Sequence, residues 1–188
     1  MPGNKSKGAV KAKLLSSETI YDGRIFKITR DRVDEPSGLR ITKEVVRHPG
    51  AVVVLPVFPD GRILLIRQYR HAADQYLWEL VAGRKEPDES FATGAARELK
   101  EETGYTARKM RKLTEVYPSP GFLTEKMEIF LAQGLTAGEA NPEDDEKIEY
   151  KIVTLKEAER WIRTGKIRDA KTATGILFYA RFVANNKR

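Results

Sequence analysis

The chain contains 188 residues, no cysteine and a formal net charge of +7. Its length suits one domain, or one domain with a small appendage, and the lack of cysteine excludes a disulfide framework and favours the reducing cytoplasm. No apolar run reaches the length of a membrane span, and the first residues lack the apolar core of a secretory signal. We therefore expect a cytoplasmic protein with no membrane partner.

The positive charge is concentrated at the two ends of the chain. Residues 1–13 carry four lysines and residues 187–188 carry two cations, which leaves a net charge of about +1 for residues 14–186. A nearly neutral body lacks the basic face that a nucleic-acid groove requires. We expect residues 1–13 to form a disordered basic tail, and we expect no nucleic-acid partner.

The body begins with an extended stretch, residues 18–46, in which apolar and polar residues alternate. Phe26 and its neighbour Lys27 would fall on opposite faces of a strand. Residues 36–38, Pro-Ser-Gly, mark a turn within the stretch. These features predict a small antiparallel sheet within residues 14–48.

Residues 49–188 predict an α/β domain with several strands and helices. The domain opens with an apolar run that fits a buried strand, a hairpin turn and a second strand. The expected strands are 51–58, 62–69, 113–116, 128–135 and 149–154, and the expected last helices are 156–164 and 169–183. Strands that alternate with helices in this way favour the α/β class.

A further helix is predicted between Ser90 and Gly104. Ser90 is a preferred N-cap residue, and Gly104 stands where a left-handed residue usually ends a helix. Glu98 lies three and four residues before Glu101 and Glu102, so the three carboxylates share one face. Like charges stacked in this way destabilise an isolated helix unless a cation neutralises them.

The carboxylate face has two interpretations. Mg²⁺ and Mn²⁺ prefer oxygen ligands, and residues 83–105 contain neither cysteine nor histidine. The alternative is a solvated acidic face whose charge is balanced by Arg97 and Lys100. The spacing of the carboxylates from Gly83 and Glu89 favours the metal site.

Gly83–Tyr105 resembles the Nudix box, the motif of hydrolases that cleave a nucleoside diphosphate linked to another moiety. The resemblance implies a Nudix-type α/β/α sandwich with a mixed sheet, in which residues 49–188 form the catalytic domain. The implied metal ligands are the side chains of Glu98, Glu101 and Glu102 and the main-chain carbonyl of Ala82. The resemblance also implies that Glu89 supports this cluster and that Arg97 orients it by ion pairing.

Features outside the box resemble the ADP-ribose pyrophosphatase subgroup. Pro120 follows Gly104 by sixteen residues, within a Ser-Pro-Gly-Phe sequence that would otherwise be an ordinary tight turn. Segments 21–26, 47–56 and 67–70 are similar to the same subgroup. The resemblance implies hydrolysis of ADP-ribose to AMP and ribose 5-phosphate with about two or three Mg²⁺ ions.

Several residues are candidates for substrate contacts, and each has a structural alternative. Arg67 and Arg70 follow a buried strand and can donate to a diphosphate, or they are plain surface residues. The candidates for stacking on adenine are Tyr21, Phe26 and Phe122. An aromatic residue in a strand is more often part of a core. Glu125 can hold ribose hydroxyls, or it is an exposed loop carboxylate.

An acidic run, Glu143-Asp144-Asp145-Glu146, precedes the last predicted strand. The resemblance implies that a carboxylate of this loop completes the metal site or activates water. Glu146 is the leading candidate, and Glu143 and Asp144 are the alternatives. The other interpretation is a flexible charged loop without a catalytic role.

Three functions remain distinct at this point. The first is ADP-ribose hydrolysis, and the second is hydrolysis of another nucleotide sugar, such as GDP-mannose. The third is non-catalytic sensing of a nucleotide, against which the intact carboxylate face argues. The resemblance further implies that the small N-terminal sheet, within residues 14–48, is exchanged across a homodimer.

Overall fold

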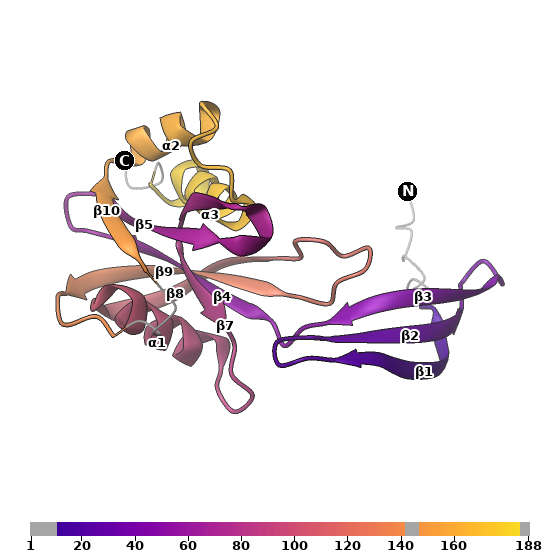
Figure 1. Cartoon of the computed structure of the whole chain (residues 1–188). Coiled ribbons are helices and arrows are strands. Elements are labelled where there is room, and N and C mark those ends of the chain that lie inside the picture. The colour runs from indigo at the N-terminus through magenta and orange to yellow at the C-terminus, as the bar shows by residue number, and fades with distance from the viewer. Residues whose placement is uncertain (1–10, 142–146, 185–188) are drawn as a thin grey trace, which may run out of the picture. The chain divides into compact units, whose positions relative to one another are not determined.

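The computed structural model describes residues 11–141 and 147–184 (Figure 1). The chain divides into two units, each with its own sheet. The first unit comprises the chain up to His48 together with Ser119–Thr124, and the second comprises Pro49–Pro118 and the chain from Glu125 onward. Each unit is described by itself.

The first unit contains the small antiparallel sheet that the sequence predicts. Its strands, in spatial order, are β1 (Lys13–Asp22), β2 (Lys27–Asp34) and β3 (Arg40–Arg47). Gly38 has a positive φ of 86°, and its N–H donates to the carbonyl of Glu35 at 2.8 Å, which closes the turn between β2 and β3. Residues 119–124 join this unit because Val46 donates to the carbonyl of Phe122 at 2.8 Å.

The start of this sheet differs from the expectation. Strand β1 begins at Lys13, which is paired with Asp34, so the start of the sheet lies inside the segment expected to be a tail. The buried residues of β2 are Thr29, Asp31 and Val33. The Asp31 carboxylate accepts from Ser17 at 2.7 Å and pairs with Arg47, which explains how a charged residue can be buried here.

The second unit is built on a sheet of seven strands. They are β4 (Ala51–Val57), β5 (Ile63–Arg70), β6 (Gln75–Glu79), β7 (Val81–Arg84), β8 (Thr106–Val116), β9 (Met127–Thr136) and β10 (Glu149–Val153). The main order is β10-β5-β4-β9-β8, with β6 paired to β5 and β7 paired to β4. Strands β4 and β9 run parallel and the other pairs are antiparallel, so the sheet is mixed, as expected.

Helices cover both faces of this sheet (Figure 1). They are α1 (Phe91–Thr103), α2 (Leu155–Arg163) and α3 (Ala170–Tyr179), with short η1 (His71–Ala73) and π-helical η2 (Ala180–Ala184) segments. Alternate residues of β4 point to opposite faces. Val52 and Val54 belong to the core that includes Leu99 of α1, whereas Val53 belongs to the core that includes Trp161 of α2. The predicted α/β/α sandwich is confirmed.

Several elements differ from the predicted ones. Strands β6 and β7 were not predicted as strands, and β8 begins at Thr106 rather than at residue 113. Strand β8 lies at the edge of the main path, and its first half carries basic residues that mask a strand pattern. The expected helix 169–183 is α3 followed by the π-helical turn. Within the described ranges, no helix is both long enough and apolar enough to cross a bilayer.

Candidate active site

Helix α1 presents the acidic face that the sequence predicts. The Ser90 side chain caps the helix by accepting from the N–H of Thr93 at 3.1 Å, and Gly104 ends it with a φ of 74°. Leu99 is fully buried against the sheet, which fixes the rotation of the helix about its axis. This rotation places the carboxylates of residues 98 and 102 one turn apart on the same face.

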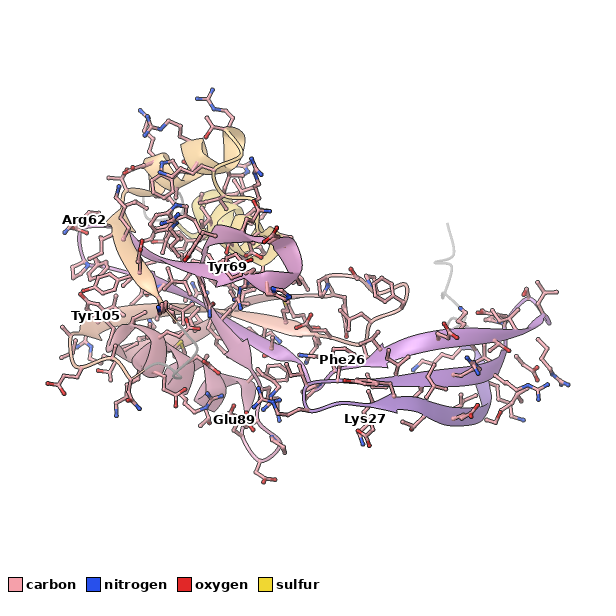
Figure 2. All side chains as sticks on the ribbon, viewed as in Figure 1. Phe26, Lys27, Arg62, Tyr69, Glu89 and Tyr105 are labelled. Atoms are coloured by element: carbon pink, nitrogen blue, oxygen red, sulfur yellow. The ribbon has the colours of Figure 1, made fainter. Side chains whose placement is uncertain are left out.

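Arg97 contacts carboxylates from helix α1 and from the loop that precedes it. Its guanidinium donates to Glu89 at 2.7 and 3.2 Å, to Glu98 at 2.7 Å and to Glu101 at 2.9 Å. It also donates to the main-chain carbonyl of Arg84 at 3.1 Å. Figure 2 labels Glu89 at the end of α1 that follows β7. Arg97 therefore orients the acidic side chains relative to the loop that leads into the helix.

The charge of this cluster is unbalanced. Three carboxylates share the Arg97 guanidinium, and the charge of Lys85 also acts on Glu89 as a lesser cause, so the carboxylates outnumber these cations. The hydrogen bonds to Glu89 raise the pKa of Arg97, and the same contacts, more than any other cause, hold the pKa of Glu89 below its ordinary value. A surplus of ionised carboxylates favours the binding of a cation.

Gly83 brings strand β7 against the same carboxylates. A Cβ atom at this position would overlap the carboxylate of Glu98, so a larger residue here would force that side chain to move. The preceding residue, Ala82, pairs with Val53 of the central strand β4. The main chain at residues 82–83 and the Glu98 side chain are therefore close neighbours.

Glu102 completes the acidic face and is only 4% exposed. Among the described residues, which exclude 142–146, no group of three or more acidic or histidine side chains is arranged to hold a metal ion by itself. Mg²⁺ commonly takes one or two protein carboxylates and fills its remaining positions with water and substrate phosphate oxygens. An all-oxygen donor set with surplus negative charge fits this cation.

Arg70 is held by a partner that the sequence did not reveal. Its Nε and Nη2 atoms each donate to the Glu79 carboxylate at 2.8 Å. Glu79 is fully buried and also accepts from Nζ of Lys171 at 2.5 Å. A carboxylate at this depth requires compensating cations, but the sequence does not show that Glu79 is buried, so it carried no signal for this pairing.

Arg67 is engaged in contacts on the other side of strand β5. It donates to Glu149 of β10 at 3.3 Å, and its guanidinium lies 4.6 Å from the ring centre of Tyr76. Both contacts involve partly or fully exposed groups, so each holds the side chain weakly. The structure therefore places Arg67 and Arg70 in different surroundings.

The predicted aromatic contacts belong to the first unit. Tyr21 and Phe26 lie at the turn between β1 and β2 with ring centres 5.7 Å apart, and neither is buried. Phe122, at 56% exposure, lies in the segment that joins β3. Glu125 is a half-buried residue of the second unit. The predicted loop carboxylates Glu143, Asp144 and Glu146 lie outside the described residues.

Comparisons with known proteins agree with this architecture. The NUDIX domain model matches residues 46–174. An ADP-ribose pyrophosphatase of Bacillus subtilis is 38% identical over 172 residues, which is 90% of this chain and 93% of that protein. A GDP-mannose pyrophosphatase of Citrobacter koseri is 36% identical over 174 residues, covering 87% of this chain and 89% of the relative.

A solved structure supports the fold over nearly the full length. The crystal structure of an ADP compounds hydrolase superposes with a TM-score of 0.83 and covers 97% of this chain and 100% of its own. The two sequences are 24% identical, so this likeness concerns the fold alone.

Proposed function

The chain belongs to the Nudix family, and we propose that it hydrolyses the diphosphate bond of ADP-ribose to AMP and ribose 5-phosphate. The observation that carries the proposal is the acidic cluster oriented by Arg97 beside Gly83. Its surplus of carboxylates suits a divalent cation, and the Bacillus subtilis relative is an ADP-ribose pyrophosphatase.

The cation in this proposal is Mg²⁺, with Mn²⁺ as a substitute. The residues that would hold it are Glu98, Glu101, Glu102 and the main-chain carbonyl of Ala82. When bound, Mg²⁺ neutralises the diphosphate and favours the ionisation of water. The protein supplies the geometry, because Arg97 fixes two of these carboxylates.

The remaining polar groups bind the substrate and move a proton. Arg70 donates hydrogen bonds to the diphosphate, with Arg67 as a second donor. A water molecule attacks one phosphorus atom, the bridging P–O bond breaks, and a carboxylate of the acidic loop accepts the proton of the water. Glu146 is the leading candidate for this base, with Glu143 and Asp144 as alternatives.

The nucleoside and ribose contacts follow from the exposed groups. We assign adenine stacking to Tyr21, Phe26 or Phe122, all of which leave ring surface uncovered. Glu125 accepts from ribose hydroxyls. In this proposal the small β subdomain, residues 14–48, contributes Tyr21 and Phe26, and residues 49–188 form the catalytic domain, which contributes Phe122 and Glu125.

The same subdomain suggests a homodimer. Every residue of strand β1 is exposed, including Leu14, Leu15 and Ile20. Exposed apolar side chains along one strand favour association with a second copy of the chain. Sedimentation velocity would test this, and a monomer at the concentrations used for activity would contradict it. A cysteine-free dimer of this kind suits the cytoplasm.

A substrate panel tests the proposed reaction. ADP-ribose, GDP-mannose and other nucleoside diphosphate derivatives would be incubated with Mg²⁺, and the products would be separated by chromatography. We expect AMP and ribose 5-phosphate in equal amounts and the highest kcat/KM for ADP-ribose. A variant with Glu98→Gln and Glu102→Gln, purified in the same way, excludes a contaminating hydrolase.

The alternatives predict different results in the same panel. Preference for GDP-mannose would support the activity of the Citrobacter koseri relative instead. No turnover of any compound would favour a nucleotide sensor and would overturn the proposed reaction.

A further inference from the structure

A four-residue ionic network lies between strand β6 and the start of helix α3. Glu79 pairs with Arg70 and Lys171, and Lys171 also donates to Asp169 at 2.9 Å. Two carboxylates thus meet two cations. Glu79 is 1% exposed at its side chain and Lys171 is 12% exposed, whereas Arg70 is 36% exposed. Arg70 is therefore the member of the network that reaches solvent.

The network is anchored to rigid main chain. Asp169 caps α3 by accepting from the N–H of Thr172 at 2.9 Å. The Thr172 hydroxyl donates to Asp169 at 2.5 Å and accepts from the N–H of Leu80 at 2.8 Å. Leu80 directly follows Glu79 and precedes strand β7. The first turn of α3 therefore holds the buried carboxylate in place.

The arrangement leaves part of the Arg70 charge available to a ligand. Burial alone would raise the pKa of Glu79, but the hydrogen bonds from Arg70 and the charge of Lys171 outweigh it and hold that pKa below its ordinary value. Because Lys171 also neutralises the ionised Glu79, Arg70 does not supply all of the compensation. The bidentate pair occupies one edge of the guanidinium, through Nε and Nη2, and leaves further N–H donors.

Arg70 also lies within electrostatic reach of the acidic face of α1. Its pKa is raised first by the hydrogen bonds to Glu79, and the charges of Glu102 and Asp169 add to the effect. A diphosphate bound at the Glu102 carboxylate would thus be attracted by the positive charge of Arg70.

We propose that Lys171 and Glu79 are positioning residues that fix and charge-compensate Arg70 for binding a diphosphate. This inference rests on the proposed function, since it assigns a role within the same site. Lys171 touches no substrate in this scheme and acts only through Arg70. Without Lys171, the negative charge of Glu79 would be balanced by Arg70 and by no other cation in the described part of the chain. Arg70 would then bind the diphosphate more weakly.

A double-mutant cycle on ligand affinity tests the inference without relying on turnover. The ligand is α,β-methylene ADP-ribose, in which carbon replaces the bridging oxygen, and its Kd is measured by calorimetry in Mg²⁺. The proteins are the wild type, Lys171→Met, Arg70→Ala and the double variant. Lys156→Met, at an exposed position in α2, is the matched control.

We expect Lys171→Met to raise Kd about tenfold or more in the wild type and less than about twofold in the Arg70→Ala background. An equal factor in both backgrounds would show that Lys171 acts independently of Arg70. An unchanged Kd in Lys171→Met, or no binding by the wild type, would also overturn the inference. Lys156→Met should match the wild type.

A second variant covers the case in which Lys171→Met does not fold. Glu79→Gln keeps the side-chain volume and removes the charge that fixes Arg70, so it should show the same dependence on Arg70. Wild-type turnover is measured separately. If the wild type bound the methylene analogue but cleaved no ADP-ribose, the proposed function would be refuted. The double-mutant cycle on Kd would still test the role of Lys171 and Glu79.

Discussion

Around Arg97 three carboxylates share one guanidinium, whereas around Glu79 two carboxylates meet two cations. The two clusters belong to the same unit and use the same residue types. The first is partly exposed and carries surplus negative charge. The second is centred on a fully buried carboxylate whose charge is matched.

The difference separates a cluster whose negative charge calls for a cation from one whose charges are paired within the protein. Buried charges are tolerated only when they are paired, so the Glu79 network is satisfied within the protein. The Arg97 cluster keeps its like charges together at an energetic cost that a bound cation would remove. Experiments that alter charge should therefore affect metal-dependent turnover in the first cluster, and both stability and diphosphate affinity in the second.

Removal of metal should have the largest effect. With excess chelator, turnover of ADP-ribose should fall to the uncatalysed background, and Mg²⁺ or Mn²⁺ should restore it. The thermal midpoint should rise when Mg²⁺ is added, because a ligand that binds the folded state stabilises it. Full turnover in excess chelator would contradict the interpretation of the surplus carboxylates.

Glu102→Gln should lower turnover by about a thousandfold or more, equivalent to on the order of 4 kcal/mol of transition-state stabilisation. The change preserves volume and relieves like-charge repulsion, so the unliganded protein should be as stable as the wild type or slightly more stable. Turnover at saturating Mg²⁺ and the thermal midpoint are the measurements.

Leu99→Ala, at a buried apolar position of α1, is the comparison variant. Leu99 is fully buried, so its truncation should cost about 2 to 5 kcal/mol of stability while the folded fraction stays active. Near-native turnover of Glu102→Gln, or inactivity caused only by unfolding, would exclude Glu102 as a metal ligand.

The sequence predicted much of the fold because its periodic patterns are local. The cap residue Ser90, the left-handed Gly104 and the buried run of β4 each act over a few neighbouring residues. Strands β6 and β7 were missed because both are short and only one residue separates them. The sequence therefore has no turn residues between them to mark where one strand ends and the next begins.

The candidate site was predictable only in part, for a related reason. Glu98, Glu101 and Glu102 lie within one helix, so their shared face follows from spacing alone. Glu79 and Lys171 are 92 residues apart, and only the packing of α3 against the β6–β7 region brings them together. Sequence reasoning assigned Arg70 to the substrate but could not reveal the carboxylate that holds it.

Glu79→Gln should destabilise the protein without metal by about 3 kcal/mol, since it leaves Arg70 and Lys171 without their common counter-charge. Urea denaturation measures the loss. Glu159→Gln, at an exposed position of α2, is the control and should change stability by less than about 0.5 kcal/mol. If Glu79→Gln had the same unfolding free energy as the wild type, the charge of Glu79 would not stabilise the buried network.

The smallest effect is the pH dependence of that loss. The pKa of Glu79 in the folded protein lies below its ordinary value of 4.5, so its ionised form stabilises the fold. This contribution is fully present above about pH 4.5 and disappears as the pH falls through the folded-state pKa, because both states are then protonated. The difference in unfolding free energy between wild type and Glu79→Gln should therefore be constant near neutrality and shrink below about pH 4.5.

Urea denaturation of both proteins between about pH 7 and pH 3.5, in chelator, would measure this convergence. Other carboxylates with lowered pKa values, such as Glu89, are present in both proteins, so their effects cancel in the difference. Each pH unit below the ordinary pKa should remove at most about 1.4 kcal/mol of the gap. If the difference in unfolding free energy stayed constant or widened on acidification, Glu79→Gln would destabilise the protein through lost packing or hydrogen bonds and not through lost charge. The contrast between the two clusters would then not be electrostatic.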